Sequence, residues 1–406
     1  MRVYLDHQAA TPVLPEVRAA MEPFLRENFG NPSSLHQEGF VAREALAKAR
    51  EQVAAFLGAT SPDEIIFTGN GTEAVNLAIK GIAWANERRG RHILLSAIEH
   101  PAVAHSVKWL SEHGFSSSIV PVDREGRLGI DALKSAVRED TILVCTHHTN
   151  HDIGTLQQVR EIGDFTSERG IPLFVDAIAS AGWLPVNVED LRADLVAISP
   201  HRFYGPKGVG VLYRHRRAQV QSVVHGGEQE GGRRAGTENI AAIVGAGIAA
   251  QIAQSDCSAR EQHTRRLQTE TLARLRGTVS HLKLNGPEPG PARHPANLNL
   301  SVEFAEGEAL GLMLDVRGIA VATGSACVAK NQPVPPVLAA IELPETLARG
   351  NVIFSFGKDN TEAELDYFVE TFAKTVSAVR EMSSEWEDFQ KGAIRSALSS
   401  EARSAV

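Results

Sequence analysis

Short apolar runs, each bounded by polar or glycine residues, recur through the first 250 residues. Runs of this length and composition predict buried strands rather than helices. They are Ile65–Thr68, His92–Leu95, Thr141–Cys145, Leu173–Asp176, Leu195–Ile198 and Val209–Tyr213. Between them lie helical patterns. In Thr72–Glu87, for example, the apolar positions Ala74, Leu77, Ala78, Ile82 and Ala85 gather near one stripe.

This alternation predicts an α/β fold with a mainly parallel sheet covered by helices. Such sheets bind ligands at the carboxyl ends of their strands. Past Cys257 the pattern changes to a charged helix near 258–276, a half-buried strand at Ala296–Val302, a helix at Gly307–Val316, a strand at 318–322 and a long helix at Thr361–Met382.

We therefore expect two domains and a tail. Residues 14–256 form the large domain, and residues 1–13 with 257–390 form a smaller α/β domain. Residues 391–406 are rich in Ser, Ala and Arg and predict a loosely held end.

Charge and composition exclude several classes of protein. The formal charge is 41 − 49 = −8, so no basic excess exists to neutralise nucleic-acid phosphates. No apolar run approaches about 18 residues, and we expect no membrane association. The first residues lack the apolar core of a signal peptide. Three cysteines are too few for a disulfide framework, and a cytoplasmic location is the simplest expectation.

Candidate ligand-binding residues follow several of the predicted strands. Gly71 and Thr72 open a helix directly after Ile65–Thr68, where free backbone N–H groups bind phosphate well. A tight structural turn explains this segment equally well by itself. Ser199 and His201, which follow another strand, favour the phosphate site.

Asp176 ends an apolar strand, where a carboxylate is costly unless it has a partner. The alternative is an Asp that caps a turn. His100 follows the strand at His92–Leu95, and a lone loop histidine is often merely surface polarity. Cys327 follows the strand at 318–322 and suits a reactive thiolate if it is exposed. The alternative for a cysteine is a buried inert thiol, which we expect for Cys145.

Several gapless motifs together resemble the cysteine desulfurases, a branch of the class V aminotransferase superfamily. The motifs are Tyr4-Leu-Asp6, Gly30-Asn-Pro-Ser-Ser-Leu-His36, Glu99-His100, Asp152-Ile-Gly154, Ser199-Pro-His-Arg-Phe-Tyr-Gly-Pro-Lys-Gly208, Arg234-Ala-Gly-Thr237 and Thr323-Gly-Ser-Ala-Cys327. The resemblance runs from about Tyr4 to Val379. It implies a fold type I pyridoxal phosphate (PLP) enzyme with a mainly parallel seven-stranded sheet and a smaller C-terminal domain that carries Cys327.

The resemblance also implies roles for the candidate residues. Thr72, Ser199 and His201 hold the PLP phosphate, and a homodimer adds Thr237 from the second subunit. Asp176 pairs with the pyridine nitrogen. His100 stacks on the ring and moves protons, and Cys327 carries persulfide sulfur toward an acceptor protein.

Several positions depart from the family pattern, among them His7-Gln8, which replaces Asn-Ala in the N-terminal motif. Arg202 stands where the family has the lysine that holds PLP as a Schiff base, and a guanidinium stays protonated and cannot act as that amine. Ile353 replaces the arginine that grips the substrate carboxylate. Ala179 and His151 replace a Gln and an Asn near the PLP phenolic oxygen. Lys207 matches a separate lysine of the pattern.

These departures leave two hypotheses. In the first, the protein is a diverged enzyme with PLP or pyridoxamine phosphate (PMP) held non-covalently. Arg202 binds an anionic group of a small-molecule ligand, and His100 or His151 serves as base. In the second, it is a non-catalytic relative, either a partner subunit or a persulfide carrier through Cys327. A metal site from His100, His151, Asp176 and His201 is a weaker idea, because no short ligand spacing supports it, and we expect none.

Overall fold

A seven-stranded sheet forms the centre of the large domain in the computed structural model, which describes residues 1–324 and 334–398. Its strand order is β2-β8-β7-β6-β5-β3-β4. The strands are β2 (Ile65–Thr68), β3 (His92–Ser96), β4 (Ser116–Val120), β5 (Thr141–His147), β6 (Leu173–Asp176), β7 (Leu195–Ile198) and β8 (Gly210–Arg214). Only β8 runs antiparallel to its neighbours, so the predicted, mainly parallel sheet is confirmed.

Helices cover both faces of this sheet. The longer helices of the large domain are α1 (Pro15–Arg26), α2 (Gln37–Leu57), α3 (Gly71–Asn86), α4 (Pro101–Ser111), α5 (Ile130–Ala136) and α6 (Val159–Glu168). Apolar side chains on all faces of the central strands are buried, as parallel sheets with helices on both sides require. The central strands β5, β6 and β7 are therefore closed to water, whereas the edge strand β4 carries serines at half-buried and exposed positions.

The smaller domain is built on a second, antiparallel sheet. Its order is β12-β13-β10-β9, with β9 (Leu282–Leu284), β10 (Asn297–Val302), β12 (Ala322–Thr323) and β13 (Asn351–Ser355). Beside it, β1 (Val3–Tyr4) pairs in parallel with β11 (Ile319–Ala320). The helices α8 (Gly307–Val316), α9 (Pro336–Ala340), α10 (Glu345–Ala348), α11 (Glu362–Glu381) and α12 (Ser384–Gln390) complete this domain. The strand expected at 318–322 is thus broken into two.

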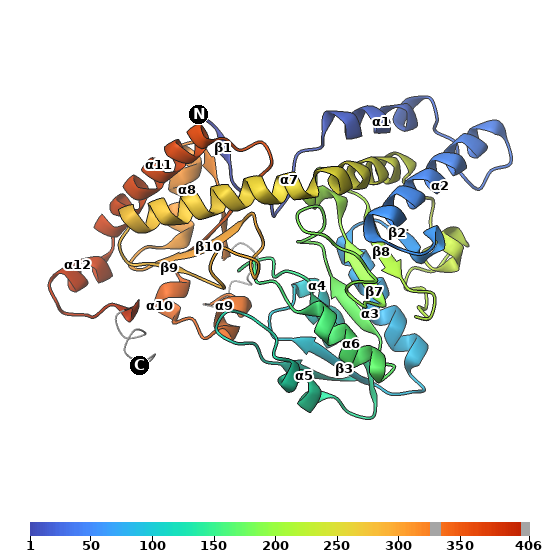
Figure 1. Cartoon of the computed structure of the whole chain (residues 1–406), viewed down its shortest axis with the longest axis horizontal. Helices are drawn as coiled ribbons and strands as arrows, with labels where there is room; N and C mark the ends of the chain where they lie inside the picture. The colour runs from blue at the N-terminus through green and yellow to red at the C-terminus, as the bar shows by residue number, and fades with distance from the viewer. Residues whose placement is uncertain (325–333, 399–406) are drawn as a thin grey trace.

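One helix, α7 (Ile240–Thr278), connects the two domains without a break (Figure 1). The boundary expected at residues 256 and 257 falls inside it. By length and composition alone α7 passes as a membrane span, but 56% of its most apolar window is buried inside the protein. It packs against α1 and α2 at one end and α11 at the other, as a core helix does.

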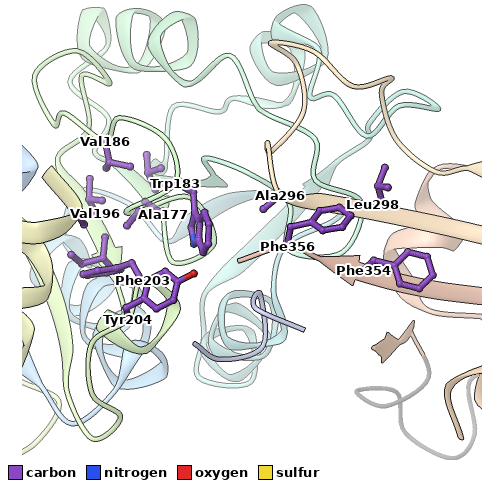
Figure 2. Packing of buried hydrophobic residues seen from close by; sticks show 14 of the residues in the cluster. Ala177, Trp183, Val186, Val196, Phe203, Tyr204, Ala296, Leu298, Phe354 and Phe356 are labelled. Carbon is purple, nitrogen blue, oxygen red and sulfur yellow. The ribbon is translucent and has the colours of Figure 1, made fainter. Parts of the chain in front are cut away.

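The core is continuous between the domains. Figure 2 shows Trp183 and Tyr204 on the side of the large sheet and Ala296 and Phe356, which directly flank β10 and β13, on the side of the small domain. These side chains are all buried. The shared core fixes the strand ends of the large sheet relative to the small domain.

Two residues of the tail make hydrogen bonds to the small domain, whereas residues 391–395 are exposed. Of residues 391–406, those up to 398 are described, and Ser396 is only 3% exposed. Its hydroxyl donates to Glu303 Oε2 at 2.6 Å, and the Ala397 N–H donates to Glu303 Oε1 at 2.6 Å. A buried carboxylate thus holds this part of the tail, because it needs hydrogen-bond donors that the core does not supply. Residues 399–406 lie outside the described part.

Candidate functional site

A pocket of about 190 Å³ opens at the carboxyl ends of β5, β6 and β7. It brings together eight of the ten predicted site residues from five separate segments. The lining residues are Asn70, Gly71, Thr72, His100, His147, Thr149, His151, Asp176, Ile178, Ala179, Ser199, His201 and Arg202. A volume of this size suits a ligand with one ring rather than a dinucleotide.

One end of the pocket is shaped for an anion. Asn70 caps α3 by accepting the Glu73 N–H at 2.8 Å, so the first turn of the helix points its free N–H groups outward. A Cβ on Gly71 would lie 2.7 Å from Ile178 Cδ1 and 3.2 Å from Ser199 Cβ. Any larger residue at position 71 would therefore displace the end of the Ile178 side chain, which itself lines the pocket. Ser199 Oγ lies 2.8 Å from His201 Nδ1, which completes a polar rim.

Asp176 forms the opposite, buried side. It ends β6, is 6% exposed, and accepts the Ile178 N–H at Oδ1 over 2.9 Å. Burial raises the pKa of this carboxyl, and the charge of Glu99 adds to the rise. The Ile178 N–H and the nearby His151 and His147 oppose it. A buried carboxyl at this place fits the ring nitrogen of a pyridine ligand.

His100 and His151 face each other across the pocket mouth. Their rings are in edge contact, with centroids 4.9 Å apart. His100 caps α4 by accepting the Ala102 N–H at Nδ1 over 3.0 Å. Burial first, and then His151 and Arg202, lower the pKa of His100 to about 3. Neutral His100 therefore carries its proton on Nε2, which makes it a hydrogen-bond donor rather than a base.

His201 and Arg202 occupy the short turn after β7. The backbone oxygen of Arg202 accepts from Trp183 Nε1 at 2.8 Å, and the His201 oxygen accepts from Thr11 Oγ1 at 2.9 Å. These bonds fix the turn from both domains. Burial, with Arg202 and Lys207, lowers the pKa of His201 to about 4. The turn thus concentrates positive charge and holds its histidine neutral, which favours an anionic ligand.

Two predicted residues lie elsewhere. Thr237 is exposed and lines a separate cavity of about 210 Å³ with Gly69, Arg234 and Asn239. The chain does not bring it to its own pocket, and the prediction that a second subunit uses it stays open. Cys327 lies outside the described residues, which stop at Gly324 on that side. Cys145 is buried as expected, and burial raises the pKa of its thiol.

The other departures lie as follows. Ala179 lines the pocket, and its backbone oxygen lies 3.0 Å from His294 Nε2 of the small domain. Ile353 is central in β13, 7% exposed, and pairs with Ala322 and Asn299. It presents apolar surface only.

His147 and Glu99 form a buried pair beside the pocket that no sequence pattern predicted. His147 Nδ1 lies 2.7 Å from Glu99 Oε1, and both side chains are buried. His148, on the opposite face of the strand, contacts Ser180 instead. No pattern signalled the Glu99 contact, because the two residues are 48 positions apart.

The cavity with the greatest volume among those described so far contains none of the predicted site residues. This cavity, of about 670 Å³, lies between the end of α7, α11 and α12 and is lined mainly by polar surface residues. Across residues 1–324 and 334–398, no group of three or more His, Cys, Asp or Glu side chains is placed to hold a metal ion.

Comparisons with known proteins agree with the arrangement of these motifs. The class V aminotransferase family matches residues 3–368. The chain is 42% identical over 388 residues to a cysteine desulfurase IscS of Dictyoglomus turgidum, covering 95% of this chain and 98% of that protein. It is 41% identical over 390 residues to the IscS of Clostridium botulinum strain Hall, covering 96% and 98%. A solved NifS-like protein superposes with a TM-score of 0.87 at 36% identity, covering 93% of this chain and all of that one.

Proposed function

The chain belongs to the class V aminotransferase family, within its cysteine desulfurase group, and we propose that it holds PLP or PMP without a covalent bond and acts on a ligand other than ordinary cysteine. Enzymes of this family depend on PLP. The single observation that carries the proposal is the guanidinium of Arg202 in the wall of the pocket, where the family pattern has its lysine.

The pocket otherwise fits the cofactor. The N-terminus of α3 with Thr72, Ser199 and His201 would hold the phosphate, and Asp176 would hold the ring nitrogen. PLP bound there supplies an electron sink for carbanion chemistry. The residues of the chain bind and orient it, and the indole of Trp183 and the core behind it keep water out.

Arg202 changes what the pocket can do. A guanidinium cannot lose its proton at a working pH, so it neither attaches the cofactor nor carries a proton to and from a ligand carbon. It can instead bind a carboxylate or phosphate by two hydrogen bonds. With Ile353 apolar, the anionic group of the ligand would move from the side of β13 to the side of Arg202.

Proton transfer then falls to the histidines. His100 offers an N–H toward the pocket because its Nδ1 is occupied by the Ala102 N–H. His151, beside it, has Nε2 3.7 Å from Asp152 Oδ2 and is the side chain placed to accept a proton. We propose His100 as the donor and His151 as the base.

We propose that the protein works as a homodimer. Exposed apolar side chains gather in the α1–α2 segment, with Leu25 62%, Phe29 76%, Leu35 96% and Phe40 47% exposed. An apolar group of this kind usually marks an interface. Thr237 is exposed and does not line the pocket of its own chain, which supports a role for it at the phosphate site of a neighbouring subunit.

The test is the cofactor attachment of three proteins. Wild-type protein mixed with PLP is expected to gain a visible band that gel filtration at low cofactor concentration removes, and its mass should not change after borohydride reduction. Arg202→Lys should retain PLP and gain its mass after reduction. Lys207→Arg is the matched control. Lys207 is exposed and lies in the loop that follows Arg202, and this variant should behave as wild type.

Two results would contradict the proposal. A covalent PLP adduct in the wild-type protein that disappears in Lys207→Arg would show that Lys207 has taken the role of the missing lysine. Release of sulfide from cysteine and a reductant at a rate unaffected by Arg202→Lys would show ordinary desulfuration. No uptake of PLP at all would favour the second hypothesis, a partner subunit or sulfur carrier.

A further inference from the structure

One buried hydroxyl in the wall of the pocket makes no hydrogen bond. Thr149 lines the pocket and is 2% exposed. Within the part of the chain that the structure describes, its Oγ1 is buried and has no hydrogen-bond partner. Such a hydroxyl destabilises the ligand-free protein, because it has lost its hydrogen bonds to water and gained none. Asp176 in the same pocket, by contrast, accepts the Ile178 N–H.

The backbone around this threonine is held by a short hairpin. Thr149 forms an isolated antiparallel bridge with Leu156, and the Asn150 N–H donates to the Thr155 oxygen at 2.8 Å. The position of the Thr149 Cβ is therefore set by the backbone. Rotation about the Cα–Cβ bond exchanges the hydroxyl and the methyl group between staggered positions. The hydroxyl can thus turn toward a ligand in the pocket without any movement of the backbone.

Thr149 is the middle one of three pocket residues on the same side of an extended segment. His147, Thr149 and His151 line the pocket at every second position, as side chains on one side of an extended chain do. The two residues between them contact other parts of the protein, namely Ser180 Oγ and the Ile98 oxygen.

The neighbours of Thr149 place it between the buried side and the mouth of the pocket. His147, two residues before it, pairs in register with Asp176 on the adjacent strand. His151, two residues after it, has its ring centroid 4.9 Å from that of His100 at the mouth. A ligand ring that reaches from the mouth to Asp176 therefore passes Thr149.

The strand order indicates which edge of that ring faces Thr149. The strands β7, β6 and β5 are consecutive in the sheet. Ser199 follows β7 at the anion end of the pocket, Asp176 ends β6, and Thr149 follows β5. In PLP and PMP, the phosphate arm and the ring hydroxyl lie on opposite sides of the line through the ring nitrogen and the carbon opposite it. A ring with its phosphate near Ser199 and its nitrogen at Asp176 therefore turns its hydroxyl edge toward β5.

We propose that Thr149 is a further ligand-binding residue of this pocket, whose hydroxyl forms a hydrogen bond with the ring oxygen of PLP or PMP. The identity of the ligand rests on the proposed function. A threonine hydroxyl can donate to an ionised ring oxygen or accept from a ring hydroxyl, so it fits both protonation states of the ligand. The side chain of Ala179, which also lines the pocket, offers only a methyl group. The ligand gives the buried hydroxyl the partner that it lacks in the ligand-free protein.

Fluorescence titration with PLP and with 3-deoxypyridoxal phosphate, which lacks the ring hydroxyl, tests this contact. The measured quantity is the ratio of the two dissociation constants, so that intrinsic differences between the ligands cancel when variants are compared. Thr149→Val keeps the shape of the side chain but removes the hydroxyl, and should reduce the preference for PLP about fivefold, as the loss of one hydrogen bond does. Thr149→Ser keeps the hydroxyl and should retain the wild-type preference.

Thr155→Val is the matched control from the same hairpin. Thr155 is buried, and its hydroxyl already donates to the Glu125 oxygen, so its removal should leave the preference for PLP unchanged. Thermal unfolding without ligand gives a second readout. Thr149→Val removes an unpartnered polar group and should leave the melting temperature unchanged or raise it, whereas Thr155→Val should lower it.

The inference is overturned if Thr149→Val and wild type show the same preference for PLP over the 3-deoxy analogue. A ligand-free Thr149→Val protein that melts below wild type, or does not fold, would also overturn it, because the hydroxyl would then serve the fold. If wild type binds neither ligand, the proposed function fails and this inference fails with it. Binding of PLP with a preference independent of position 149 contradicts this inference alone.

Discussion

Two fully buried histidines make this fold sensitive to acid in a way that can be measured. His148, 7% exposed, contacts Ser180 Oγ through Nδ1 at 2.9 Å. His294, 0% exposed, accepts the Ala296 N–H at Nδ1 and lies 3.0 Å from the Ala179 oxygen through Nε2. Both contact the segment that follows Asp176, His148 through Ser180 and His294 through Ala179.

Burial is the main cause that lowers the pKa of His148 to about 4 and that of His294 to about 3. Their ordinary value in an unfolded chain is about 6.5. Between these pKa values the unfolded chain binds protons at the two histidines and the folded chain does not. The free energy of unfolding is therefore at its full value above about pH 6.5 and falls as the pH drops toward about 4. Between pH 7 and pH 5 each histidine removes about 2 kcal/mol, or about 4 kcal/mol together. That is a large share of the roughly 5–15 kcal/mol of a typical domain.

The assay is urea unfolding at pH 7 and pH 5, from which the loss of unfolding free energy is taken. His294→Gln should shrink that loss by about 2 kcal/mol relative to wild type, whatever its stability at pH 7. His225→Gln, at an exposed position, controls for the substitution itself. If His294→Gln loses as much stability between the two pH values as wild type, the buried neutral histidine is not the cause and the reasoning fails.

Three further outcomes follow from the pocket and the surface. Gly71→Ala should weaken PLP binding about tenfold in fluorescence titration, because its Cβ pushes Ile178 into the pocket; unchanged affinity would contradict the close approach. Asp176→Asn should weaken PLP binding about 10- to 100-fold, as the loss of a charged hydrogen bond does, and equal binding would remove the ring nitrogen from this site. Leu35→Asp, 96% exposed, should raise the dimer dissociation constant at least about 100-fold by light scattering and leave the fold intact by circular dichroism, whereas the same change at exposed Val224 should not.

Local pattern predicted six of the seven strands of the large sheet. Strands such as Leu173–Asp176 are continuous apolar runs because a parallel strand that is covered by helices is buried on both faces. The pattern did not predict β4, because this edge strand is not buried on both faces. Its serines alternate between half-buried and exposed positions at the sheet edge, so Ser116–Val120 has no apolar run.

The sequence predicted which strand-end residues meet in the pocket. Gly71, Asp176 and Ser199 each follow a strand, and parallel strands end at one edge, so their convergence follows from topology. The continuity of α7 did not follow, because its composition changes from apolar to charged near residue 256 while the backbone stays helical. Composition reports the surroundings of a helix and not where it stops.

By itself, then, the sequence determined the fold class, the polar candidate residues that follow successive strands, and the charge of the side chain at position 202. The tertiary structure decided which side chains from distant parts of the sequence lie buried together. Glu99, His147 and Gln157 form one buried hydrogen-bonded group, although they lie in segments of the sequence that no local pattern connects. Protonation in a buried site depends on contacts and burial, which no run of residues along the chain encodes locally.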